Sequence, residues 1–78
     1  MKMETIGANI RKVRLQKKMR QEDLAEKADL TPNYIGAIER GEKVPSLEAL
    51  VAIMNALGTS ANIIFQDVDD FTLQIITE

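Results

Sequence analysis

The apolar residues of the first 57 positions recur every three or four residues, which is the spacing of one face of a helix. This spacing predicts four helices, over residues 4–18, 21–28, 32–40 and 47–57. The last of these has an unusually broad apolar arc, and we expect it to be largely buried along one side of the core. A fifth, short helix is expected to begin at Thr59 or Ser60 and to carry Ile63, Ile64 and Phe65.

The pattern of apolar residues changes near the C-terminus. Phe71, Leu73 and Ile75 occupy alternate positions, and alternation of this kind predicts a short strand. A single strand has an unpaired edge and is unstable alone in water. We therefore expect residues 67–78 to pair antiparallel with the same strand of a second subunit, which makes these three residues candidate dimer contacts. Packing within the subunit and a loose tail are the alternatives.

Residues 21–41 carry the signals of two short helices joined by a tight turn. Asp29 is one of the few non-glycine residue types that tolerate the left-handed conformation of such a turn. Thr31 is expected to cap the next helix, and Pro32 falls at its first position, where a missing N–H has no consequence. Gly41 is expected to end that helix in a left-handed cap.

Residues 21–41 also resemble the helix-turn-helix of the Cro/lambda-repressor-like, or XRE-type, regulators. The matching residues are Gln21, Leu24-Ala25 and the closing Ile35…Ile38-Glu39-Arg40-Gly41. The resemblance extends in weaker form over residues 6–65, and in size the chain is similar to restriction–modification controller proteins. It implies an all-α, five-helix, lambda-repressor-like DNA-binding domain, which we place at residues 1–66. The β-strand that the alternation predicts within residues 67–78 is then a C-terminal extension that departs from the five-helix pattern. Asp29 departs from the family, which usually has glycine at this turn.

Two charged residues lie where the helical pattern predicts the protein interior. Arg14 lies about 40° from Ile10 around the first helix, at the edge of its apolar face. Glu39 lies on the inward face of the third helix, beside Ile35 and Ile38. A buried charge requires a partner, so we predict an ion pair between Arg14 and Glu39. The family that the chain resembles often pairs an arginine and a glutamate at these positions.

The opposite face of the third helix carries small and polar residues. Asn33, Ala37 and Arg40 lie together on this outward face. Asparagine can bond adenine through N6 and N7, alanine can contact a thymine methyl group, and arginine can bind guanine or a phosphate. A helix used only for packing or protein docking is the alternative, but its exposed face would be more apolar.

The resemblance adds further candidate DNA contacts, because recognition helices of this family place their N-terminal turn in the major groove. Gln21 and Thr31 are expected to bond phosphates or flanking bases, and Arg40 and Lys43 to bind the DNA backbone. Tyr34 has two open interpretations, a hydroxyl that bonds phosphate or a ring that only packs. The candidate DNA-binding residues are therefore Gln21, Thr31, Pro32, Asn33, Tyr34, Ala37, Arg40 and Lys43.

The formal net charge of −2 is unexpected for a DNA-binding protein, but the charge is unevenly distributed. Residues 1–45 contain all ten Lys and Arg and seven Asp and Glu, which leaves +3. Residues 46–78 contain five acids and no base, which leaves −5. A basic half beside an acidic half suits a molecule with one DNA-facing side, although ordinary solvated surface charge gives the same count.

Composition excludes several classes of site. With no cysteine and no histidine, the sequence offers no disulfide, no thiolate or zinc site and no imidazole catalyst. We expect no enzyme activity, no metal and no cofactor. No apolar run approaches the roughly 18 residues of a membrane span, and no signal-peptide pattern is present, which favours a cytoplasmic protein.

We therefore expect a sequence-specific regulator that binds double-stranded DNA as a homodimer on a pseudo-palindromic operator, and by resemblance a repressor. In similar proteins the fifth helix contributes to a two-fold contact, which adds Ile63, Ile64 and Phe65 to the candidate dimer residues. No small-molecule ligand is evident. The alternative is a protein-interaction module, such as an antitoxin-like domain that docks a partner through residues 63–76.

Overall fold

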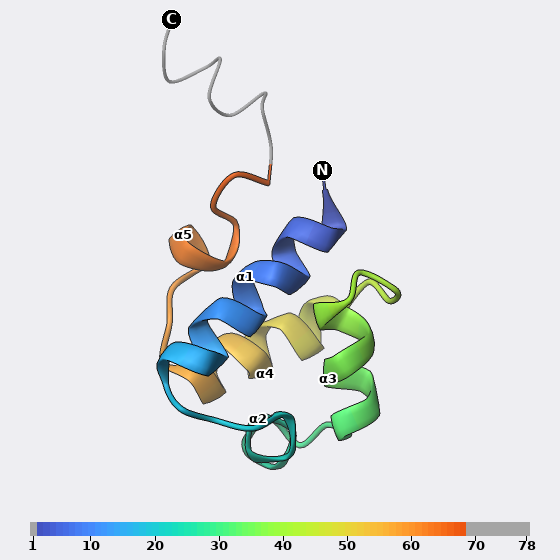
Figure 1. Cartoon of the computed structure of the whole chain (residues 1–78), viewed down its shortest axis with the longest axis vertical. Helices are drawn as coiled ribbons and strands as arrows, with labels where there is room; N and C mark the ends of the chain where they lie inside the picture. Colours follow the sequence, from blue (N-terminus) through green and yellow to red (C-terminus); the bar gives the residue numbers. More distant parts are fainter. Residues whose placement is uncertain (1, 69–78) are drawn as a thin grey trace, which may run out of the picture.

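The computed structural model of the chain describes residues 2–68. It contains five helices, α1 (Met3–Gln16), α2 (Gln21–Ala28), α3 (Pro32–Glu39), α4 (Leu47–Leu57) and α5 (Ala61–Ile64) (Figure 1). The predicted all-α, five-helix fold is confirmed, and residues 2–68 contain no strand. The predicted strand with Phe71, Leu73 and Ile75 lies outside the described residues. None of the five helices is both long and apolar enough to cross a membrane.

The first helix is shorter at its C-terminal end than the sequence predicts. It ends at Gln16 rather than at residue 18, and Lys18 has a left-handed backbone with φ 58°. The backbone N–H of Met19 then donates to the carbonyl oxygen of Arg14 at 3.1 Å, which turns the chain toward α2. The apolar periodicity stops at Val13, so it could not define this boundary.

The capping signals of the sequence correspond to helix ends in the structure. The side-chain oxygens of Thr31 and Ser46 each accept a hydrogen bond from a first-turn backbone N–H of α3 and α4, both at 3.1 Å. Asp29 adopts the left-handed conformation, with φ 57° and ψ 44°. Gly41 and Gly58, which follow α3 and α4, also have positive φ. The predictions for Thr31, Asp29 and Gly41 are confirmed.

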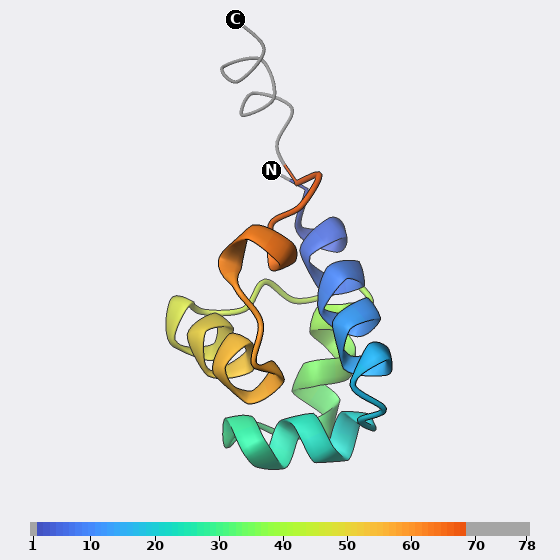
Figure 2. The ribbon, with the colours of Figure 1, turned by 90° about the vertical axis from the view of Figure 1, so that its left-hand side faces the viewer.

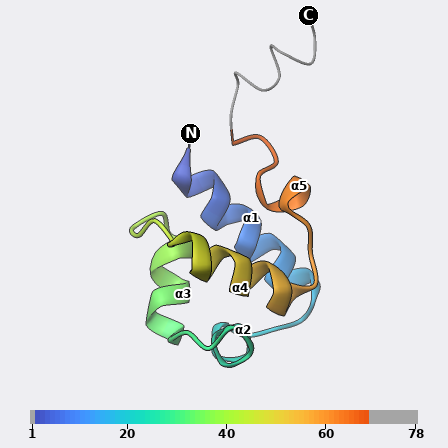
Figure 3. The same cartoon turned by 180° about the vertical axis from the view of Figure 1, so that it is seen from behind.

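The helices enclose one core. Figures 1 and 3 show α1 and α4 on opposite sides of the domain, with α2 at its lower end. Helix α2 packs against α3 and α4, and α1 packs against α3 and α5. All five helices contribute apolar side chains to the core, which consists of Ile6, Ile10, Val13, Leu24, Ala25, Ala28, Ile35, Ile38, Leu50, Ile53, Leu57, Ile64 and Val68.

The two ends of the described chain lie side by side. The backbone N–H of Lys2 donates to the carbonyl oxygen of Val68 at 3.2 Å, and Figure 2 shows the start of α1 beside the segment that follows α5. The Val68 side chain is buried and packs in the core. Val68 therefore packs with the helices.

The apolar arc of α4 is only partly buried, contrary to the expectation from the sequence. Leu50, Ile53 and Leu57 lie in the core, whereas Leu47 is 78% and Val51 is 43% exposed. These two exposed residues lie one turn apart on the same edge of the helix. The broad apolar arc in the sequence predicts more burial of α4 than the structure shows, because a helix buries only the side on which it meets its neighbours.

Gly7 permits the close approach of α1 to α3. A Cβ at this position would overlap the backbone carbonyl group of Ile38, which cannot move without displacing α3. We expect Gly7→Ala to lower the free energy of unfolding by about 2–3 kcal/mol, measured by urea denaturation.

Gly36→Ala is the matched control for this substitution. A Cβ at Gly36 would meet only the flexible ends of Arg40 and Gln21. Alanine also favours a helix interior by about 1 kcal/mol over glycine, so this variant should be as stable as the unmodified protein or more stable. Equal losses of stability in the two variants would contradict the role assigned to Gly7.

Candidate nucleic-acid interface

The turn between α2 and α3 leaves the N-terminal end of α3 exposed. The backbone N–H of Leu30 donates to the carbonyl oxygen of Ala25 at 2.8 Å and so completes the end of α2. Pro32 occupies the first position of α3, with Thr31 as its cap. The side chains of Thr31, Pro32 and Asn33 are all exposed. The first turn of α3 is therefore accessible to a ligand.

The buried and exposed faces of α3 are those that the helical angles predict. Ile35, Ile38 and Glu39 are buried. On the other side, Asn33 and Arg40 are exposed and Ala37 is half-buried. The inner face thus anchors the helix, while the outer face presents small and polar side chains.

The predicted ion pair between Arg14 and Glu39 is present and buried. Arg14 Nε donates to Glu39 Oε2 at 2.7 Å, and Arg14 Nη2 donates to Glu39 Oε1 at 3.0 Å. The two side chains are only 8% and 2% exposed. Such paired, charge-assisted bonds are strong. They raise the pKa of Arg14 above its ordinary value, although burial acts in the opposite direction.

Two further hydrogen bonds, which the sequence did not predict, complete this cluster. Arg14 Nη1 donates to the carbonyl oxygen of Met19 at 2.8 Å, and Gln21 Nε2 donates to Glu39 Oε1 at 3.1 Å. Within residues 2–68, every buried side-chain nitrogen or oxygen has a partner. We call Arg14, Met19, Gln21 and Glu39 the buried ion-pair cluster. It joins α1, the segment before α2, the start of α2 and the end of α3.

Gln21 is held in place by this cluster. The sequence predicts that it bonds phosphates or flanking bases, but one of its amide hydrogens points to Glu39. Its carbonyl oxygen and second amide hydrogen remain available, and the residue is partly exposed. Gln21 therefore remains a candidate DNA contact whose orientation is set from the protein interior.

Arg40 is bound by an acidic neighbour, Glu42. Arg40 Nε donates to Glu42 Oε2 at 2.7 Å, and Arg40 Nη2 donates to Glu42 Oε1 at 3.2 Å. Both side chains are 58% exposed. The hydrogen bonds from Arg40 lower the pKa of the Glu42 carboxyl group, so both groups are charged at neutral pH. The sequence brings the two residues within two positions of each other, but only the turn at Gly41 decides that they meet.

The loop after α3 folds back onto that helix. The backbone N–H groups of Glu42 and Lys43 both donate to the carbonyl oxygen of Ala37, at 2.9 and 3.3 Å. The Lys43 side chain is exposed. The loop therefore places Lys43 at the C-terminal end of α3.

Tyr34 connects the starts of α3 and α4. Its ring packs against the core, and its hydroxyl oxygen accepts a hydrogen bond from the backbone N–H of Ser46 at 3.3 Å. The hydroxyl proton is still available as a donor. Both interpretations of Tyr34, packing and phosphate binding, are compatible with this geometry.

The candidate dimer residues Ile63 and Ile64 of α5, and Phe65 directly after it, differ in their exposure. Ile63 is 48% exposed and Phe65 is half-buried, whereas Ile64 is fully buried in the core. Successive residues of a helix point about 100° apart, and here Ile64 faces the core while Ile63 faces outward. Ile64 is a core residue of the monomer, and its assignment as a surface contact is corrected.

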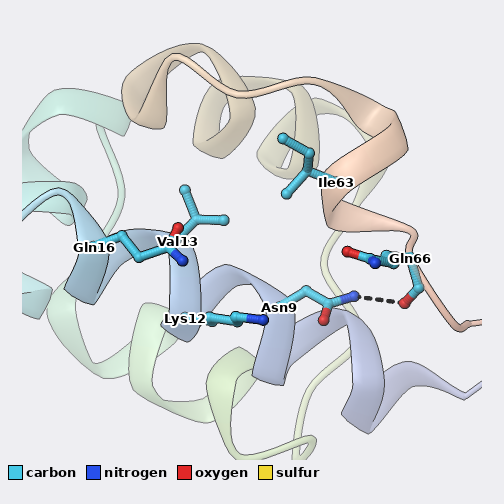
Figure 4. Close-up of a pocket in the computed structure, with 6 residues that line it drawn as sticks. All are labelled: Asn9, Lys12, Val13, Gln16, Ile63 and Gln66. Atoms are coloured by element: carbon cyan, nitrogen blue, oxygen red, sulfur yellow. Dashed lines mark hydrogen bonds between the residues drawn. The ribbon is translucent and has the colours of Figure 1, made fainter.

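Asn9 holds α5 against α1. Asn9 Nδ2 donates to the carbonyl oxygens of Ile64 and Gln66, at 2.8 and 2.9 Å. Beside this contact lies a groove of about 220 Å³, with Ile63 on its α5 side (Figure 4). The sequence offered no signal for the role of Asn9, because its partners are carbonyl groups more than fifty residues away. The groove is lined by Asn9, Lys12, Val13, Gln16, Ile63 and Gln66.

The buried ion-pair cluster predicts a strongly non-additive response to mutation. We expect Glu39→Met alone to lower the free energy of unfolding by about 3–5 kcal/mol, because it leaves the Arg14 charge buried without a counter-ion. The double variant Arg14→Met, Glu39→Met should lose less, since no uncompensated charge remains. Urea denaturation of the single and double variants measures both losses. A double variant less stable than Glu39→Met would contradict this prediction.

Comparisons with known proteins agree with this geometry. A helix-turn-helix family model matches residues 10–64. The immunity repressor protein of Bacillus phage phi105 is 42% identical over 60 residues, which are 77% of this chain and 42% of that repressor. Control protein C.BamHI of Bacillus amyloliquefaciens is 42% identical over 67 residues, which are 85% of this chain and 78% of that protein.

A solved structure extends the comparison to three dimensions. The tetramer of the restriction-modification controller protein C.Esp1396I, in complex with its natural 35 base-pair operator, is similar with a TM-score of 0.76 at 32% identity. That match covers 100% of this chain and 97% of the controller chain. The match to the phage repressor spans less than half of its length, whereas the match to C.BamHI spans most of that protein. The chain therefore belongs to the XRE-type helix-turn-helix family of DNA-binding transcriptional regulators.

Proposed function

We propose that this chain acts in the cytoplasm as a homodimer that binds a pseudo-palindromic operator and represses transcription. The observation that carries the proposal is the exposed polar face of α3, whose opposite face is anchored by the buried ion-pair cluster. Two similar proteins support the operator binding and the repression in this proposal. One is an immunity repressor, and the other, C.Esp1396I, forms a complex with its operator as a tetramer. A two-fold symmetric dimer would contact half-sites about one helical turn, or roughly 34 Å, apart.

The base contacts of this proposal come from the outward face of α3. Asn33 lies in the exposed first turn, where its amide can form two hydrogen bonds with one adenine. Ala37 lies one turn later and is half-buried, so it can contact a thymine methyl group without separating the helix from the groove. Pro32 contributes apolar contact at the helix start.

The backbone contacts surround this face. Lys43 and Arg40 supply cations at the end of α3, and Thr31 and Gln21 supply neutral donors at the starts of α3 and α2. The hydroxyl proton of Tyr34 adds a further donor near Ser46. Contacts of this type position the protein on the duplex and carry no sequence information themselves.

The dimer contact of this proposal combines α5 with the C-terminal segment. Ile63 and Phe65 offer apolar surface that a second copy would cover, at a gain of about 25 cal/mol per Å² buried. The alternating Phe71, Leu73 and Ile75 would pair edge to edge with the same segment of the partner.

A protein-docking role is the second candidate function. Val44 and Leu47 are strongly exposed at the start of α4, and Val51 follows on the same edge. Exposed apolar residues that lie together mark contact sites for other proteins. Such a site is compatible with DNA binding, as in antitoxin-like regulators that do both.

Selection of binding sites from a random duplex library, at fixed and moderate salt, tests the proposed function directly. Enrichment of a two-fold symmetric motif is the expected result. A non-symmetric motif would contradict the homodimer. The absence of any enrichment would exclude sequence-specific DNA binding and leave protein docking as the function of the domain.

Substitutions at Asn33 and Lys43 should separate base reading from backbone contact. Asn33→Ala should weaken binding to the selected site by about 1–3 kcal/mol and relax the preference at one base pair, because its two hydrogen bonds read a single base. Lys43→Ala should weaken binding to all sequences alike and lower the salt slope by about one unit. Titrations with selected and scrambled duplexes measure both effects. An unchanged sequence preference in Asn33→Ala would exclude base reading by this residue.

Removal of residues 69–78 should weaken dimerisation and leave the fold intact. The chain is cut after Val68 because that residue packs in the core and its carbonyl oxygen bonds Lys2. Sedimentation equilibrium over a concentration series measures the dimer dissociation constant. The full-length variant Ile63→Asp tests the α5 part of the contact in parallel. An unchanged dissociation constant in the shortened chain would rule out a role for the tail.

A further inference from the structure

The ion pair of Arg40 and Glu42 lies at the edge of the proposed DNA-binding face. A Cβ on Gly36 would be 3.0 Å from Arg40 Nη1 and 3.4 Å from Gln21 Oε1. The Arg40 guanidinium group and the Gln21 amide therefore lie over the same glycine, between the start of α2 and the end of α3. Glu42 accepts two hydrogen bonds from Arg40, so its carboxylate also lies at the edge of the proposed DNA-binding face.

This carboxylate opposes the binding of a polyanion. It accepts hydrogen bonds from Arg40 Nε and Nη2, two donors of the planar fork that would otherwise bind the oxygens of a phosphate. A carboxylate and a phosphate present oxygens to this fork in a similar way, so they compete for one guanidinium group. A negative charge beside the DNA backbone adds repulsion.

Glu42 has no evident structural role that would explain its position. Within residues 2–68, its carboxylate accepts hydrogen bonds from Arg40 alone. The turn is held instead by backbone bonds, in which the N–H groups of Gly41 and Glu42 donate to the carbonyl oxygens of Ile38 and Ala37. The pair of Arg20 and Asp23 differs in this respect, because Asp23 Oδ2 also accepts the backbone N–H of Arg20 at 2.8 Å and so caps α2.

We propose that Glu42 limits the affinity for DNA by competing with the phosphate backbone for Arg40. This inference rests on the DNA-binding function proposed above. DNA gains the paired contact with Nε and Nη2 of Arg40 only by displacing the carboxylate. An exposed ion pair is weak enough to exchange its partner without any change in the backbone. Because the contested contact is with the backbone, Glu42 sets the overall affinity and leaves the sequence preference unchanged.

The variant Glu42→Gln tests this proposal because it keeps the size of the side chain and removes its charge. We expect binding to tighten about three- to tenfold on selected and scrambled duplexes alike, measured by fluorescence anisotropy between about 50 and 200 mM salt. The salt slope should steepen by up to about one unit, since no cation is then needed to neutralise a displaced carboxylate.

Two controls accompany this variant. Glu26→Gln removes the same charge from the exposed surface of α2 and should change the affinity much less. Urea denaturation should show equal stability for Glu42→Gln and the unmodified protein, because the pair is exposed. An equal gain in affinity from Glu26→Gln would mean that the gain comes from the change in net charge alone, and it would overturn the proposal.

The Arg40→Gln background distinguishes competition from simple repulsion. If Glu42 acts through Arg40, Glu42→Gln should have little effect in this background, and a gain of undiminished size there would overturn the proposal. Unchanged or weaker binding of Glu42→Gln in the otherwise unmodified chain would also overturn it, and weaker binding would mean that Glu42 holds Arg40 in a productive position. If the unmodified protein shows no salt-dependent DNA binding, the proposed function itself fails and this inference fails with it.

Discussion

The buried hydrogen bonds between Arg14 and Glu39, together with the bond from Gln21 to Glu39, join α1 to the two helices, α2 and α3, that carry candidate DNA contacts. Transfer of two charges out of water costs several kcal/mol per ion, and a buried pair offsets this cost only when its remaining polar groups are satisfied. Here the carbonyl oxygen of Met19 and the amide of Gln21 complete the set. Helix α3 has only eight residues and would be marginal alone, so its position depends on these bonds and on its buried isoleucines. Gly7 allows α1 to come close enough to α3 for the pair to form.

Ion pairs within the chain also determine how much positive charge the candidate DNA-binding side of the molecule offers to DNA. Arg14 is buried with Glu39, Arg20 is bound by Asp23, and Arg40 is bound by Glu42. The net charge of +3 for residues 1–45 counts these arginines as equal to exposed lysines. Their acidic partners lie within a few ångströms, so their field at a distance is largely cancelled. The affinity for a phosphate backbone therefore depends on the exchange of partners at individual side chains more than on the overall charge.

Much of the fold and the inner half of the site could be predicted from the sequence. Helix type, the cap at Thr31 and the left-handed turn at Asp29 depend on hydrogen bonds within a few residues, so a local pattern is enough to indicate them. The same holds for the two faces of α3, which follow from the helical angle alone. Even the distant pair of Arg14 and Glu39 could be inferred, because two opposite charges directed into one small core have few other partners.

The amino-acid sequence by itself determined the helices, their caps, the sidedness of α3 and the buried ion pair. Only the tertiary structure decided which neighbour each remaining side chain meets. It packed Val68 into the core, exposed Leu47, buried Ile64 and joined Asn9 to carbonyl groups across the fold. It also directed the Gln21 amide to Glu39 and the Arg40 guanidinium group to Glu42. The physical reason is that exposure and hydrogen-bond choice at these positions depend on the surfaces of other elements, and no periodicity within a single helix contains that information.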